Sequence, residues 1–139
     1  MGWLFWASLS ALFAGLTAIL AKVGITGTDA NLATAVRTTV VLAFTWLLAA
    51  ITSRPGALQA LTPRTWLFLI LSGLATGASW LCYFRALQLG DVSQVAPIDK
   101  LSVAVAIVLA VVFLGEKPSA KEGIGAGLVI LGALVLAWR

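Results

Sequence analysis

The stretch MGWLFWASLSALFAGLTAILA, residues 1–21, contains no charged side chain and is long enough to cross a membrane. A bilayer core of about 30 Å needs roughly 20 helical residues, and an apolar run of about 18 or more is typical of a spanning helix. Four further charge-free runs follow, at residues 38–53, 65–84, 101–115 and 123–138. The run at 65–84 is also long enough by itself. The other three reach the required length once a charge at the border is included in the helix.

These runs predict an all-α integral membrane protein in which the whole chain, 1–139, forms a single domain of five transmembrane helices. The expected helices cover about residues 3–22, 31–52, 64–87, 92–114 and 119–138. Their links are short, and short links place neighbouring helices antiparallel. The first run lacks the basic start of a signal peptide, so we expect a mature first helix.

The composition excludes several other classes of protein. Of the 139 residues, 61% are hydrophobic and 10% are charged, whereas a soluble domain carries about 25% charged residues. The continuous apolar runs lack the alternation of a β-barrel. There is no His, a single Cys at position 82, and no metal, phosphate or triad motif. We therefore expect no enzyme activity, no metal and no cofactor. The net charge of +4 does not predict nucleic-acid binding, because Lys and Arg mostly set the orientation of a membrane protein.

The Lys and Arg residues near the helix ends are almost balanced between the two sides of the membrane. One side carries Arg54, Arg64, Lys117 and Lys121, and the other carries Lys22, Arg85 and Arg139. The rule that positive charges stay inside favours an inside amino terminus by this small margin. A balance this close is also expected of a protein that inserts in both orientations. Both interpretations stay open at this point.

Capping signals predict where two of the helices begin. Thr28 or Asn31 is expected to cap the second helix. Ser119, with Glu122 three residues later, matches the S-x-x-E capping box and is expected to begin the fifth.

Arg37 lies inside the second predicted span, with Thr34, Thr38 and Thr45 on its helical face or next to it. An unpaired Arg inside a membrane helix costs roughly 2.5–3.5 kcal/mol. Arg37 therefore either has a partner or a water-filled cavity, as a substrate-pathway residue would, or it snorkels and anchors the helix end.

Asp99 and Lys100 follow Pro97 in the fourth predicted span. Pro97 removes one backbone donor, which loosens the helix start, and half-helix ends and kinks of this kind line substrate sites in secondary transporters. Adjacent helical residues point about 100° apart, so the two charges are not expected to pair with each other. An acid near a helix start suits the helix dipole, whereas Lys100 opposes it there, which favours a functional or paired role for Lys100.

The third span carries a polar stripe of Ser72, Thr76, Ser79 and Tyr83, with Trp80 beside it. We place these residues, with Arg37, Asp99 and Lys100, in a candidate substrate pathway. The alternative is a stripe that only packs by hydrogen bonds against other helices, at about 0.6 kcal/mol per contact.

Two G-x-x-x-G patterns predict close helix packing. Gly73 and Gly77 form one, and Gly123 and Gly127 form the other. Small residues let helix backbones approach closely in membranes. The fifth helix is the candidate for a contact between subunits.

The second half of the chain resembles the EamA module of the drug/metabolite transporter superfamily. The resemblance rests on YFRAL at 83–87, VAP at 95–97, FLGEK at 113–117 and GAGLVILG at 125–132. Members of that family typically resemble a duplicated ten-helix chain with two oppositely inserted halves, and this chain resembles one half. The resemblance implies an antiparallel homodimer or a second five-helix subunit. Unlike the related four-helix multidrug exporters, this chain has no acid in its first helix, so their proton exchange cannot be carried over.

The leading hypothesis is a dimeric secondary transporter that exports small metabolites or drug-like solutes, with access alternating around the bilayer midplane. It would lie in a bacterial or archaeal cytoplasmic membrane. Arg37 and Lys100, with Arg85 as a further candidate, favour an anionic or zwitterionic substrate, and Asp99 is the candidate proton or cation site. A non-transporting membrane subunit and a flippase for lipid-linked metabolites are the alternatives.

Overall fold

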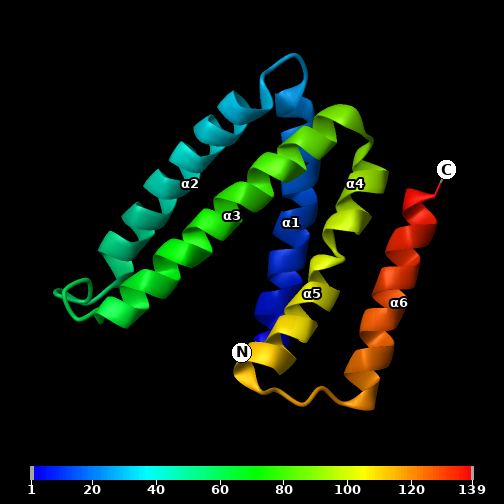
Figure 1. The fold of residues 1–139 in the computed structure, drawn as a ribbon. Coiled ribbons are helices and arrows are strands. Elements are labelled where there is room, and N and C mark those ends of the chain that lie inside the picture. Colours follow the sequence, from blue (N-terminus) through cyan, green and yellow to red (C-terminus); the bar gives the residue numbers. More distant parts are fainter. Residues whose placement is uncertain (1, 139) are drawn as a thin grey trace. The chain divides into compact units, whose positions relative to one another are not determined.

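The computed structural model describes residues 2–138, and these residues form helices without any strand (Figure 1). In chain order, the elements are α1 Trp3–Ile25, α2 Ala30–Thr52, α3 Pro63–Leu89, α4 Val92–Asp99, α5 Ser102–Leu109, η1 Ala110–Leu114 and α6 Ala120–Ala137. Because α4, α5 and η1 together make one span, five segments are long and apolar enough to cross a membrane. The predicted all-α fold of five spans is confirmed. Met1 and Arg139 lie outside the described residues. Arg139 is one of the residues that were used to predict the orientation.

The spans expose their large apolar side chains and bury few of them. The buried apolar residues among those described are Ala18, Ile25, Ala30, Phe84, Leu87 and Ala133. In water this much exposed Leu, Val, Phe and Trp would be strongly unfavourable, whereas lipid tails solvate it. The chain is therefore an integral membrane protein.

The helix starts follow the capping rules, with one difference from the sequence prediction. Asp29, rather than Thr28 or Asn31, caps α2, and its carboxylate accepts from the amides of Asn31 and Leu32 at 2.9 and 3.0 Å. The prediction was wrong because Thr28 lies one residue too early and Asn31 is already helical. The predicted capping box of Ser119 and Glu122 at α6 is confirmed.

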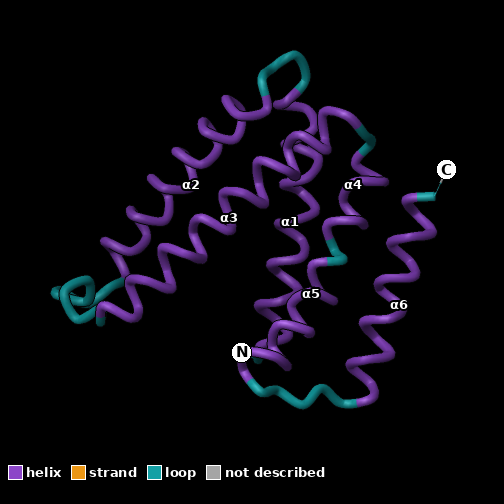
Figure 2. The backbone as a smooth tube through the Cα atoms, viewed as in Figure 1, coloured by secondary structure: helices purple, strands orange, loops and turns teal. Residues whose placement is uncertain are grey.

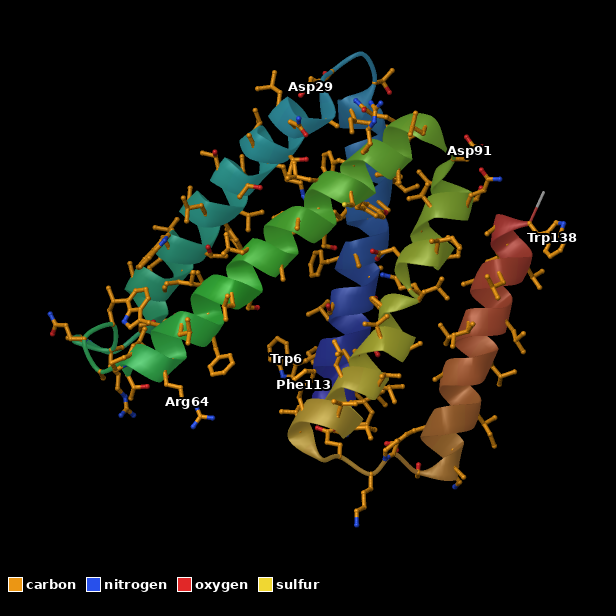
Figure 3. The ribbon with its side chains drawn as sticks, in the orientation of Figure 1. Trp6, Asp29, Arg64, Asp91, Phe113 and Trp138 are labelled. Atoms are coloured by element: carbon orange, nitrogen blue, oxygen red, sulfur yellow. The ribbon has the colours of Figure 1, made fainter. Side chains whose placement is uncertain are left out.

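The described residues divide into two compact units. The first contains residues 2–22 and 89–138. Within it α4 packs closely against α6, whose less exposed face includes Ile130 together with small side chains. Ala133 is buried, and Ala126 and Ala137 on the same face are half-buried. Figure 3 places Trp6 and Phe113 toward one end of this unit and Trp138 toward the other, as in the aromatic belts of membrane proteins.

The fourth span is interrupted, where the sequence predicted one continuous helix at 92–114. Figure 2 shows the interruption between α4 and α5 as a short non-helical segment. Here the Lys100 amide donates to Pro97 O, and the Leu101 amide donates to Ile98 O, both at 3.0 Å. These bonds span three residues instead of four, so the backbone is tightened where α4 ends. The span then ends in the π-helical turn η1, which Gly115 closes with a positive φ of 67°.

The second unit contains residues 23–88 and is built on the antiparallel pair α2 and α3. Its link between α2 and α3 turns at Gly56, whose φ is +80°. Figure 3 places Asp29 toward one end of this unit and Arg64 toward the other, so its charged residues extend to both ends of the hairpin. Arg37 lies between those ends, inside α2.

Candidate functional site

Arg37 lies over aromatic side chains of α3. Its guanidinium carbon is 4.3 Å from the centroid of the Trp80 ring and 5.4 Å from that of Phe84. A cation within about 6 Å of a ring is attracted to its negative face, by up to about 2 kcal/mol where water is excluded. The sequence left open whether Arg37 has a partner or snorkels, and the structure gives it two aromatic partners.

The partners of Arg37 share one face of α3. Trp80 and Phe84 are four residues apart, and Leu87 follows three residues later, so the three side chains lie above one another on the helix. Phe84 is 3% exposed and Leu87 is 0% exposed. Sequence reasoning selected Trp80 but missed Phe84. The i, i+4 spacing of the two rings was the available signal.

The threonines near Arg37 do not serve as its partners. The hydroxyls of Thr34 and Thr38 donate to the carbonyls of Ala30 and Thr34, both at 2.7 Å. Thr45 donates to Val41 O at 2.8 Å. Such bonds to the preceding turn satisfy the hydroxyl donors within the helix. The cationic group of Arg37 therefore relies on the aromatic rings.

The residues of the predicted polar stripe on α3 differ in how exposed they are. Ser72, Thr76 and Ser79 are exposed, and the Thr76 hydroxyl donates to Ser72 O at 2.9 Å. Tyr83 is half-buried and lies near Arg37. Of the α3 residues assigned to a substrate pathway, the structure brings Trp80 and Tyr83 toward Arg37.

A short chain of polar contacts holds the end of α3. The Arg85 guanidinium donates to the Gln88 side chain at 2.9 Å, and the Gln88 amide donates to Thr28 O at 2.7 Å. Gln88 was not selected from the sequence. A Gln three residues after an Arg, near a helix end, was the signal for this contact.

Asp99 and Lys100 form an ion pair at the interruption of the fourth span. The Lys100 Nζ lies 3.2 Å from Asp99 Oδ2. The prediction that they would not pair was wrong. It assumed a continuous helix, whereas α4 ends at Asp99 and the flexible Lys100 side chain folds back from the capping position.

The dipole argument for Lys100 also requires correction. Lys100 lies directly before Leu101, the N-cap of α5, and also at the C-terminal end of α4. A cation is favourable at that end, where the last carbonyls carry partial negative charge. The start of α5 opposes the same charge, so the two helix ends offset each other and any functional role must follow from the pairing and surroundings of Lys100.

The four glycines predicted to pack helices do not approach neighbouring atoms closely in the described part of the chain. A Cβ added at Gly73, Gly77, Gly123 or Gly127 would meet no heavy atom within 4 Å, apart from their own helices and chain neighbours. A role in contacts with another subunit stays a prediction.

Five spans, with charged side chains inside the second and the fourth, define a polytopic integral membrane protein. The sequence pattern of the EamA-like transporter family matches residues 1–138, and the chain belongs to that family. The resemblance found in the sequence is thereby confirmed, with a half-length module.

One relative from Sinorhizobium sp. is named "Uncharacterized transporter in cobO 3'region". It is 51% identical over 138 residues, which cover 97% of this chain and 96% of the relative. The relative therefore also has room for a single five-helix module. No solved structure was found to match the chain.

Proposed function

We propose that the chain is a secondary transporter that exports small metabolites or drug-like solutes across a bacterial or archaeal cytoplasmic membrane. The family and the transporter name of the relative from Sinorhizobium sp. support transport rather than catalysis. The observation that carries the proposal is the interrupted fourth span with its ion pair. Secondary transporters build their substrate sites from discontinuous helices near the bilayer midplane.

The proposed working unit is a dimer with alternating access. Transporters of this kind combine two inverted repeats, and the site lies between them. One five-helix chain supplies one repeat, so a second copy in the opposite orientation, or another five-helix subunit, would complete the pair. The close balance of Lys and Arg between the two sides supports the homodimer.

Counterflow in proteoliposomes tests the proposal. The purified chain would be reconstituted and assayed with a panel of radiolabelled amino acids, organic acids and amines. Saturable exchange of any of them supports transport. The variants Arg37→Ala and Lys100→Ala are expected to lose most of the exchange while still inserting, because their charges are held inside spans. Arg64→Ala is the matched control, since Arg64 lies over Phe68 at 5.9 Å in the first turn of α3.

The other outcomes separate the alternatives. Normal exchange by both Arg37→Ala and Lys100→Ala would contradict their assignment to the pathway. Absence of flux for the whole panel, with another membrane protein co-purifying, would favour a non-transporting subunit. Movement of a fluorescent lipid between leaflets would favour a flippase.

A further inference from the structure

We propose that the pocket between the end of α2 and the link to α3 binds an anionic phospholipid. In this proposal Arg54 holds the phosphate diester of the lipid, and the apolar wall of the pocket holds the start of an acyl chain. The site lies entirely within the second unit. It is independent of the proposed transport function.

The pocket has a volume of about 480 Å³ and a mostly apolar wall. Its apolar side chains come from the last turns of α2 and from the link, and they are Trp46, Ala49, Ala50, Leu58 and Leu61. Arg54 supplies the one charged side chain of the lining. In a bilayer a hollow of this size fills with lipid, and its shape and charge decide which lipid is retained.

The wall on the link side is held by its own backbone hydrogen bonds. Figure 2 shows the link as a loop that curls at the end of the hairpin. The Ala57 amide donates to Arg54 O at 3.1 Å, and the amides of Gln59 and Ala60 donate to Gly56 O at 3.0 and 3.2 Å. The pocket is therefore formed before a ligand enters, which lowers the entropic cost of binding.

The depth of the lining residues matches the two parts of a phospholipid. Helix α2 ends at Thr52, so Arg54 follows the end of the span, at the level of the lipid headgroups. Trp46 lies six residues before Thr52, which is about 9 Å deeper at 1.5 Å per residue. A cation at the interface above an apolar wall follows the order of phosphate and acyl chain in a lipid.

The charge of the pocket favours a lipid with a net negative charge. The exposed Arg54 side chain has no ion-pair or hydrogen-bond partner within residues 2–138. A phosphate can accept two parallel hydrogen bonds from one guanidinium. The only acidic residue among residues 23–88 is Asp29, which lies at the other end of α2. The ammonium of a zwitterionic phospholipid would therefore find no carboxylate at this end of the hairpin.

Native mass spectrometry of the full chain tests this inference. The chain would be released from nanodiscs that contain equal amounts of phosphatidylglycerol and phosphatidylethanolamine. We expect phosphatidylglycerol to be retained at least about tenfold more strongly. Its deacylated headgroup, glycerophosphoglycerol, should not displace it, because the headgroup cannot contact the apolar wall. Equal retention of the two lipids, or displacement by the headgroup alone, would overturn the proposal.

A pair of arginine variants locates the phosphate. Arg54→Gln should weaken the retention of phosphatidylglycerol about tenfold. Arg64→Gln is the matched control, because it removes the same charge from the same end of the hairpin. Arg64 does not line the pocket and lies over Phe68 instead. An equal loss in both variants would mean that the lipid is held by a positively charged surface, and the pocket would be refuted as its site.

A pair of tryptophan variants tests the apolar wall. Trp46→Ala should weaken retention severalfold, because it removes the largest apolar side chain of the lining. Trp66→Ala is the control, since Trp66 is 42% exposed on α3 and does not line the pocket. Retention that is unchanged in Trp46→Ala would contradict the contact with an acyl chain.

Discussion

The contact of Arg37 with Trp80 is the residue-scale interaction with a measurable energy. We expect a double-mutant cycle of Arg37→Met and Trp80→Leu to give a coupling free energy of about 1–2 kcal/mol. The reason is that the guanidinium lies 4.3 Å from the ring centroid and has no threonine partner in its own helix. The free energy of unfolding in bicelles, measured by steric trapping, checks the prediction.

Arg64 and Phe68 provide the control for that cycle. Their separation is 5.9 Å, and Arg64 is exposed at the first turn of α3. Exposed cation–π pairs contribute about 0.5–1 kcal/mol at most. The coupling free energy of Arg64 and Phe68 should therefore be smaller than that of Arg37 and Trp80. Equal couplings would mean that Arg37 is as well hydrated as Arg64 and that its aromatic partners are incidental.

The sequence identified the charged residues of the candidate site better than their partners. Arg37, Asp99 and Lys100 stand out because each interrupts a span of otherwise apolar side chains. The i, i+4 spacing of Trp80 and Phe84 shows that the two rings share one face of α3. The contact of Phe84 with Arg37 was still missed, because it depends on how α2 and α3 lie against each other. The ion pair was missed because the break in the fourth span changes the local geometry.

At the scale of the helix, Asp29 is expected to stabilise the start of α2. Its carboxylate accepts two backbone hydrogen bonds, from Asn31 and Leu32. Asp29→Ala should cost about 1 kcal/mol at the helix start. Hydrogen exchange at the amides of Asn31 and Leu32 should accelerate severalfold. Asn31→Ala should leave exchange at Leu32 nearly unchanged. If Asn31→Ala accelerated it as much as Asp29→Ala, the capping role of Asp29 would be refuted.

The interruption of the fourth span is expected to depend on Pro97. Proline inside a helix costs about 3 kcal/mol, since it removes one hydrogen bond and its ring clashes with the preceding turn. Pro97→Ala should restore bonds over four residues and make Val92–Leu114 more regular. The distance between spin labels at positions 93 and 108, measured by pulsed electron resonance, should change accordingly.

Pro63 supplies the control for that measurement. It occupies the first position of α3, where proline is tolerated. Pro63→Ala should therefore leave the label distances in the fourth span unchanged. If Pro97→Ala also left them unchanged, another feature of the span would have to hold the break.

The number of spans followed from hydropathy alone, because a bilayer imposes one length on every crossing helix. The helix ends were less accessible from the sequence. Helix α3 continues to Leu89, beyond the residue 87 expected from the pattern, since Gln88 is held by Thr28 O across the hairpin. The interruption after Asp99 was also missed at this scale, because Pro97 in a sequence predicts a weakened helix without stating where the chain leaves it.

At the scale of the whole molecule, the near balance of Lys and Arg predicts insertion in both orientations. Four such residues lie toward one side and three toward the other. We expect reporters fused after the last helix, one active inside the cell and one outside, both to be active.

Adding or removing positive charges on one side should fix the orientation. Ala57→Arg with Gln59→Arg should trap one orientation. Arg54→Gln and Lys121→Gln with Leu89→Arg should trap the opposite one. If the antiparallel homodimer is the transporter, each trapped form should be inactive alone, and their co-expression should restore counterflow. Full activity of one trapped form by itself would contradict the antiparallel homodimer.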